Sequence, residues 1–463
     1  ESFPPLPLPA TPLRRSERKH EPSRPALVAK AAYGPVNWSI RDGRRVGERR
    51  WLNVTDDIRN LLGWAGRRLG FRYRHFQTTL AKFSYDPAEV PALYLTGHEP
   101  LPTLSEQQQE RLRRFLYDGG TIIANACCGA PEFREAFRRE VARLFPRRQL
   151  AALPADHPVF SACYPIRQVR YRRGDGQSSV GPPYLEGLNI GCRVAIFFAP
   201  MDLANGWYGQ APPDNYAPGA WIVGEDARKL GANILAYILA CYQYGRRRAV
   251  QKVLYQQSEP TRDELVIGQV VHDGDWDPTP DGLPGLLRAL RANSTVRVQF
   301  KRGLVSLSDD ELFSYPVLYM TGLREFDLDD GQIQRLRSYL LSGGLLVADA
   351  ACGMRAFDRA FRRQMRRVLP DRELQVLPVD HPLYSAAFEI VRVAYSPLAR
   401  QELGGADRPM LEGITVDGSL RVIYSRYSLG NGWEQIEHPY NRGYVEADAL
   451  RLGVNILVYG LTH

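Results

Sequence analysis

The sequence has few lysines, few cysteines and no long hydrophobic run. Only six of its 60 basic residues are lysines. The six cysteines stand at irregular positions, which gives neither a disulfide framework nor a Cys-x-x-Cys zinc motif, although pairing of individual cysteines stays open. No apolar stretch approaches the ~18 residues that a bilayer-spanning helix needs. These absences exclude a disulfide-rich scaffold and a membrane-spanning protein.

The remaining composition is that of an ordinary globular protein. The chain has 463 residues, 44% of them hydrophobic and 24% charged, and at roughly 100–200 residues per domain this length predicts two or three domains. A net charge of +9 would attract nucleic acid, anionic lipid or an acidic partner. The arginines, however, are spread over amphipathic segments such as Arg134–Arg148 and Arg355–Arg372. We interpret these segments as solvated helix faces, with docking of an acidic partner as the alternative, and expect no nucleic-acid binding.

The first 30 residues differ from the rest of the chain. They contain seven prolines with charged residues between them, a composition that cannot bury a core and predicts a polyproline-like arm. The chain begins with Glu1 and not with Met, as it would after removal of a leader peptide. We therefore expect a periplasmic or envelope-associated protein, with peripheral association only. A tail on a cytoplasmic protein is the alternative.

The strongest pattern is an internal repeat with an offset of about 224 residues. The run Gly119–Arg139 returns as Gly343–Arg363, and Leu153–Ala162 returns as Leu377–Ala386. Shorter matches follow in the same order towards both ends of the two copies. The chain therefore contains two copies of one domain. We divide it into an arm (1–30), a first repeat (31–245), a linker (246–262) and a second repeat (263–463).

Each copy alternates apolar strand-like runs with amphipathic helices. Short apolar runs end in Thr-Gly at Thr96-Gly97 and Thr321-Gly322, as buried strands do. Helices with capping-box spacing follow, and they stop at paired glycines before the next apolar run. This β-α-β-α order predicts one doubly wound parallel sheet per repeat, with the two α/β domains packed as a pseudo-dimer.

Ligands of such sheets bind outside the carboxyl ends of the strands, so the residues there are the candidate site. In the second repeat one strand runs into His272–Asp277, and the third ends at Asp349–Gly353; His381 follows later in an Asp-His-Pro turn. The residues that we predict to line a ligand site in the two repeats are Asp273, Asp275, Trp276, Thr321, Gly322, Gly353, Thr96, Gly97, Asn125, Cys128 and His157.

A cysteine follows the third strand of each repeat, and this strand–Cys–Gly–helix turn resembles the nucleophile elbow of hydrolases and class I glutamine amidotransferases. Cys352 would then be the nucleophile, with His381 and Asp349 as base and orienting carboxylate. The glycine before the cysteine is absent, and no His-x-Glu follows, since Pro439-Tyr440 come after His438 and place a tyrosine where the glutamate would stand. The alternative, which we favour, is a small buried thiol beneath a helix.

The segment His272–Asp277 also invites a metal interpretation, because alternate carboxylates can bind Mg²⁺ or Ca²⁺. It lacks the downstream glycine and glutamate of an EF-hand loop. Asp273 and Asp275 are therefore weak metal candidates, and hydrogen bonding to the loop backbone is the alternative. We expect no metal and no cofactor. His157 and His381, each followed by a proline, are interpreted as turn histidines.

Taken together, the Gly-Gly-initiated strand ending in Ala-Asp/Asn-Ala-x-Cys-Gly, the Asp-His-Pro turn, His272–Pro280 (HDGDWDPTP) and the ending Leu452–His463 resemble the bacterial "domain of unknown function 4159" family. The match covers nearly all of the second repeat and the first more loosely. The resemblance implies a flavodoxin-like, class I amidotransferase-like fold and an exported or envelope-associated protein. Many members carry Asp-Asp in place of the Ala-Cys pair here, which weighs against an obligatory thiol. No activity comes with the resemblance.

Two functions remain open at this stage. The first is a non-catalytic scaffold that assembles protein partners in an extracytoplasmic complex. The second is a hydrolase or amidotransferase-like enzyme at the strand ends of the second repeat. Convergence of Cys352, His381 and a carboxylate in an open pocket would favour the enzyme.

Overall fold

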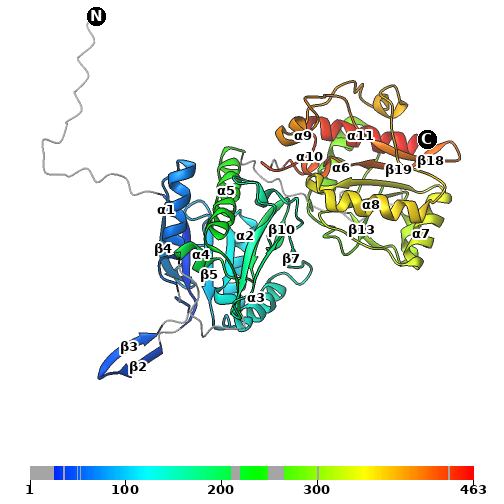
Figure 1. Cartoon of the computed structure of the whole chain (residues 1–463). Coiled ribbons are helices and arrows are strands. Elements are labelled where there is room, and N and C mark those ends of the chain that lie inside the picture. Colours follow the sequence, from blue (N-terminus) through cyan, green and yellow to red (C-terminus); the bar gives the residue numbers. More distant parts are fainter. Residues whose placement is uncertain are drawn as a thin grey trace, which may run out of the picture.

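The computed structural model describes residues 25–34, 37–48, 51–52, 54–209, 219–248, 265–299, 302–435 and 438–463. Within these ranges each repeat forms one seven-stranded sheet with helices on both faces (Figure 1), so the predicted α/β class with two similar domains is confirmed. Most of the predicted arm and linker lies outside the described residues.

The sheet of the first repeat has the strand order β4-β1-β5-β6-β11-β10-β7. The five strands from β4 to β11 are parallel, and β10 and β7 are antiparallel at one side. In chain order the parallel strands run 2-1-3-4-5, which is the flavodoxin-like order. The elements of this repeat are β1 Ala26–Ala32, β2 Asn37–Arg41, β3 Arg44–Glu48, α1 Asp57–Leu69, β4 Arg74–Thr79, β5 Ala92–Gly97, α2 Glu106–Tyr117, β6 Thr121–Ala126, the 3-10 turn η1 Cys127–Gly129, α3 Pro131–Leu144, β7 Ala151–Ala152, η2 Pro158–Phe160, β8 Val169–Arg173, β9 Ser178–Gly181, β10 Glu186–Ile190, β11 Arg193–Ala199, α4 Ala204–Tyr208, β12 Ala220–Ile222 and α5 Gly224–Arg248.

The second repeat has the corresponding order β14-β13-β15-β16-β19-β18-β17. Its five strands from β14 to β19 are parallel, and β18 and β17 are antiparallel. Its elements are β13 Ile267–Val271, α6 Gly282–Asn293, β14 Gly303–Ser306, η3 Asp310–Ser314, β15 Val317–Gly322, α7 Asp330–Leu341, β16 Leu345–Ala350, η4 Ala351–Gly353, α8 Arg355–Val368, β17 Gln375–Val376, η5 Pro382–Ser385, α9 Pro397–Glu402, β18 Glu412–Val416, β19 Ser419–Ser425, α10 Gly430–Glu434 and α11 Glu446–Thr462.

Each sheet carries a hydrophobic core on both faces. In the first repeat α1, α4 and α5 cover one face and α2 and α3 the other, and in the second α6, α10 and α11 lie opposite α7 and α8. Burial on both faces explains why the central strands are continuously apolar rather than alternating. Among the described residues, no helix is long and apolar enough to cross a bilayer.

The predicted helix ends are confirmed in both repeats. Ser105 and Asp329 form capping boxes with the glutamines three residues on. The helices α2 and α7 end before Gly119 and Gly343, whose φ values of +109° and +104° suit glycine.

One boundary prediction needs correction. The first repeat begins at Ala26 and not at residue 31, because the apolar run after the last proline is the buried strand β1. The repeated Asn-Gly-Trp segments lie in the short helices α4 and α10. Their tryptophans are core residues, and the indole N–H groups of Trp207 and Trp433 donate to the carbonyls of Ala227 and Ala449.

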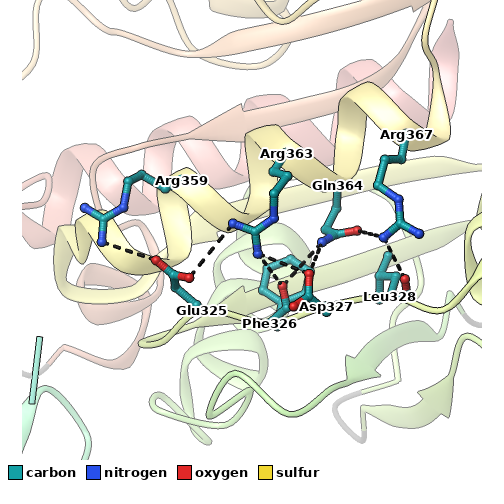
Figure 2. Close-up of polar contacts among 8 residues, drawn as sticks. All are labelled: Glu325, Phe326, Asp327, Leu328, Arg359, Arg363, Gln364 and Arg367. Carbon is teal, nitrogen blue, oxygen red and sulfur yellow. Dashed lines mark hydrogen bonds and ion pairs between the residues drawn. The ribbon is translucent and has the colours of Figure 1, made fainter. Parts of the chain in front are cut away.

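The arginine face of α8 is bonded to its own domain. Figure 2 shows Arg359, Arg363 and Arg367 in a row above the loop 325–328 that precedes α7. Arg363 donates to the Phe326 carbonyl at 3.2 Å, and Arg367 donates to the Leu328 carbonyl at 2.8 Å. These arginines therefore hold the loop 325–328 against α8. They are bonded within the domain, so fewer arginines of this helix remain available to an acidic partner than the sequence suggested.

We expect the double substitution Arg363→Ala with Arg367→Ala to lower the free energy of unfolding by about 1–2 kcal/mol, since the bonds of each half-exposed arginine together contribute about 1 kcal/mol or less. Urea unfolding measures the loss, and hydrogen exchange should rise in the loop 325–328. Arg366→Ala, an exposed arginine on the same helix, is the matched control and should change neither. Equal exchange in both variants would contradict the fastening role.

The two repeats pack head to tail. We call the edge of a sheet where its parallel strands end the carboxyl edge, and the opposite edge the amino edge. The turn between β10 and β11, at the amino edge of the first repeat, lies on the carboxyl edge of the second, where Cys192 forms a disulfide with Cys352. Arg324 donates to the Gly187 carbonyl at 2.8 Å, and the rings of Tyr237 and Tyr440 stack with centroids 4.7 Å apart. The pseudo-dimer is therefore heterologous, with different surfaces in contact.

Two histidines at this interface are held neutral. Burial and, as a smaller cause, nearby arginines such as Arg442 and Arg193 lower the pKa of both His157 and His438 to about 3. The Nδ1 of His157 accepts from the Val159 amide, and the Nε2 of His438 lies 3.4 Å from the Cys241 Sγ.

Acidification should therefore weaken the folded chain. The unfolded histidines take up protons below about pH 6.5 while the folded ones do not, so stability is complete above that pH and falls as the pH drops towards 3. We expect a loss of about 1.4 kcal/mol per pH unit for each of the two histidines. Urea unfolding at pH 7 and pH 5.5 measures it. In His438→Asn the free energy of unfolding should change less with pH than in the wild type. His463→Gln, at the exposed C-terminus, is the control, and equal pH dependence in the two variants would contradict the prediction.

Candidate functional site

The carboxyl edge of the second repeat brings several predicted residues together, and Asp349 lies at its centre. This carboxylate is fully buried and accepts hydrogen bonds from the Tyr319 hydroxyl at 2.7 Å and from the amides of Leu429 and Gly430 at 2.7 and 3.1 Å. Thr321 donates to the Asp349 carbonyl at 3.0 Å. Asp349 thus joins β15, β16 and the start of α10, and its carboxylate is occupied by these bonds.

The glycines at this edge are required by close packing. A Cβ on Gly322 would lie 2.7 Å from the Phe357 ring, and one on Gly353 would lie 2.4 Å from the Cβ of Arg442. Gly353 also has a φ of +64°. These two predicted site residues therefore let neighbouring segments approach the strand ends. As glycines, they contribute no side chain to a ligand site.

Cys352 does not form the predicted triad. It is buried in the turn after β16 with φ +54°, and its Sγ is bonded to that of Cys192. His381 begins η5, where its Nδ1 accepts from the Leu383 amide at 3.2 Å and its ring packs against Tyr459. Cys352, His381 and Asp349 each have their own structural contacts. They therefore do not converge into the nucleophile, base and carboxylate that the enzyme interpretation requires at this edge.

The segment His272–Asp277 lines a polar cavity of about 320 Å³ between the repeats. Asp275 and Trp276 lie at its wall, together with Arg147 and Arg148 of the first repeat. The Asp275 carboxylate is 3.7 Å from the Arg148 guanidinium, and that of Asp277 forms an ion pair with Arg302. These two carboxylates neutralise arginines, which leaves them poorly placed to share a metal ion.

His272 holds the turn that carries these carboxylates. Its Nδ1 accepts from the Gly274 amide at 3.0 Å, so its Nε2 is the protonated nitrogen and donates to the Thr321 carbonyl at 3.0 Å. Burial lowers the pKa of His272 to about 4. Asp275 has a φ of +58°, and burial raises its pKa. The exposed Asp273 is the carboxylate of this turn that faces solvent.

A second cavity, of about 510 Å³, lies between the repeats beside the disulfide. Both repeats contribute to its wall, the first with Tyr117, Arg193 and Cys241 and the second with Pro280 and His438. None of these residues was a predicted ligand residue. Spacing along the chain could not have revealed the cavity, because its walls come from two domains whose relative placement the sequence does not specify.

The carboxyl edge of the first repeat has the same backbone with different polar groups. Asn125 stands where the second repeat has Asp349, and its side-chain amide donates to Thr96 at 3.1 Å and to the buried carboxylate of Asp202 at 2.9 Å. Each repeat thus has a buried carboxylate here, on strand β16 in the second repeat (Asp349) and in the loop after β11 in the first (Asp202). Burial raises the pKa of Asp202, which the donors around it counteract.

His98, Cys127 and Cys128 lie together at this edge, and their potential ligand atoms are all within 4.8 Å of one another. Cys128 has the same φ of +54° as Cys352. The Cys127 and Cys128 sulfurs are 3.9 Å apart, and the Asn205 amide donates to the Cys128 Sγ at 3.5 Å. A hydrogen bond from Cys127 and a second from His98 lower the pKa of Cys128 to about 6.

Sequence reasoning found only part of this group. Cys128 and the preceding Thr96-Gly97 were predicted site residues, whereas Cys127 and His98 were not. His157, which we predicted to line a ligand site, lies instead at the interface between the repeats, where it is buried. Alignment of the two repeats contained the missing signal, since His98 and Cys127 stand opposite the apolar Leu323 and Ala351.

Comparison with known proteins gives one result. A family model described as "Domain of unknown function (DUF4159)" matches the chain twice, over residues 42–239 and 266–461. No curated protein matches the chain. Each match spans the strands of one sheet, except that the first begins after β1, and the two matches confirm the tandem repeat.

Proposed function

Because the chain belongs to the DUF4159 family, with two tandem copies of its domain, we propose that it is a non-catalytic binding and assembly protein of a bacterial extracytoplasmic complex. The observation that supports this best is that the carboxyl edge of the second repeat already binds protein. In a flavodoxin-like sheet that edge is where a small ligand would enter.

The occupant of this edge is the β10–β11 turn of the first repeat. The turn brings Cys192 to Cys352, and Arg148, in the loop between α3 and β7, lies 3.7 Å from Asp275. A thiol engaged in a disulfide is no nucleophile, so the hydrolase or amidotransferase alternative would need this contact to be broken. The second repeat acts instead as a receptor for a β-turn, which is a binding function.

The disulfide also supports the extracytoplasmic compartment. Disulfides persist in oxidising environments such as the bacterial periplasm and are rare in the reducing cytosol. This support is independent of the composition of the first 30 residues, on which the expectation was first based.

The hairpin β2–β3 offers a surface for a partner. Figure 1 shows it projecting from the first repeat, away from both sheets. Its Trp38 and Ile40 side chains are 57% and 79% exposed, and Arg45 lies over the Trp38 ring. A two-stranded hairpin is marginally stable alone in water, so contact with another protein would stabilise it.

Purification of the tagged full chain from its own cells, with identification of co-migrating proteins by mass spectrometry, tests the proposal. We expect a stable assembly with envelope proteins, and we expect Trp38→Ser with Ile40→Ser to lose partners that the wild type retains. Val180→Ser, at another exposed apolar residue of the first repeat, is the matched control. A monomeric chain whose Cys352 is labelled by iodoacetamide in the native protein would overturn the proposal.

A further inference from the structure

The group His98, Cys127 and Cys128 has the composition of a metal site. It combines two sulfurs and an imidazole, the ligands that Zn²⁺ and other borderline or soft cations prefer. The two cysteines are buried, with 1% and 4% of their surface exposed, and His98 is partly exposed. An ion would therefore be enclosed on the protein side and reachable from the side of the histidine.

The sulfur separation agrees with coordination of one ion. Two thiolates at ~2.3 Å from a tetrahedral Zn²⁺ lie about 3.8 Å apart, and the Cys127 and Cys128 sulfurs are 3.9 Å apart. The unusual backbone of Cys128, with φ +54° and ψ 13°, turns its side chain to the same side as that of the preceding residue. A small rearrangement of side chains would therefore bring all three groups onto one ion.

The second repeat shows that the fold does not require these residues. Leu323, Ala351 and Cys352 occupy the equivalent positions and form a hydrophobic cluster with Cys192. Cys352 keeps the same φ and ψ as Cys128. The same backbone thus accepts an apolar set with a disulfide in the second repeat, whereas the first repeat has His98 and Cys127 at two of these positions.

We propose that His98, Cys127 and Cys128 bind one Zn²⁺-class ion at the carboxyl edge of the first repeat, with a fourth position open to water or a ligand. Three protein ligands and one open position are typical of zinc sites that interact with other molecules. This site goes beyond the assembly function and does not depend on it.

The surroundings of the group suit a cation. The buried carboxylate of Asp202 accepts from the Asn205 side-chain amide, which also donates to the Cys128 Sγ. A thiol that binds the ion forms a metal–sulfur bond and releases its proton to solvent.

The test uses the full chain with its Cys192–Cys352 disulfide intact, stripped of metal by a chelator and titrated with Co²⁺ and then Zn²⁺. We expect one equivalent of Co²⁺ to give the thiolate charge-transfer and tetrahedral d–d bands. Zn²⁺ should displace it and protect two of the four free cysteines from a thiol reagent.

The double variant His98→Leu with Cys127→Ala copies the second repeat and is therefore expected to fold. Its affinity for the metal ion should fall by more than the ~10–100-fold that is lost when a residue that only contacts the metal ligands is changed. Cys128→Ser should behave likewise, whereas Cys163→Ser, a free cysteine elsewhere, should bind as the wild type does. The proposal is overturned if the wild type binds no more metal than the double variant, or if Cys127 and Cys128 are found joined in a vicinal disulfide.

Discussion

Replacement of Asp57 by alanine is expected to remove about 3–5 kcal/mol from the stability of the first repeat, because it leaves a buried lysine without its counterion. The Lys30 Nζ lies 2.7 Å from the Asp57 carboxylate, and the two side chains are 1% and 0% exposed. Tyr94 donates to the same carboxylate at 2.9 Å. Hydrogen exchange of β1 and urea unfolding of the full chain measure the loss.

A second variant separates charge from shape. The second repeat has Gln269 where the first has Lys30, so the double variant Lys30→Gln with Asp57→Asn replaces the ion pair by neutral groups of similar size. It should be more stable than Asp57→Ala alone, because neither charge is left uncompensated. An exposed ion pair contributes at most about 1 kcal/mol. If Asp57→Ala lowered the free energy of unfolding by less than this, the Lys30 side chain would have to reach solvent.

Loss of the Cys192–Cys352 disulfide should have an effect of similar size. The bond closes a loop of 160 residues, for which the chain-entropy relation gives a stabilisation of about 5 kcal/mol. In Cys192→Ser we expect the joint unfolding of the two repeats to separate into two transitions, since their contact becomes a reversible one.

Calorimetry under non-reducing conditions measures this separation. Cys163→Ser keeps the disulfide and should unfold as the wild type does, while added reductant should make the wild type behave as Cys192→Ser. One cooperative transition at an unchanged temperature in Cys192→Ser would show that the non-covalent contacts alone hold the repeats together.

The fold could be predicted because its signals are local. Gly119 and Gly343 mark helix ends, Ser105 and Asp329 mark helix starts, and the buried strands are apolar throughout, so each element is determined by a few neighbouring residues. The first five residues of β1, 26–30, were assigned to the arm because the prolines before them are a stronger sequence signal than a short apolar run. Burial of that run against β4 and β5 depends on residues far away in the chain.

The sites were harder to predict because their partners are distant. Asp349 was expected at the carboxyl edge and lies there, but its bonds to Leu429 and Gly430 come from 80 residues away. The pairing of Cys352 with Cys192 depends on which surfaces of the two repeats meet, and no local pattern contains that information. His98 reaches Cys128 only through the parallel pairing of β5 with β6.

The head-to-tail contact gives the two repeats unequal roles. A contact between unlike surfaces leaves one unmatched surface on each repeat, and in principle allows copies to be added without limit. Gly418 of the β18–β19 turn occupies the position of Cys192. The second repeat can therefore accept a disulfide at its carboxyl edge but has no sulfur in its own turn to donate one, so the covalent link has a direction.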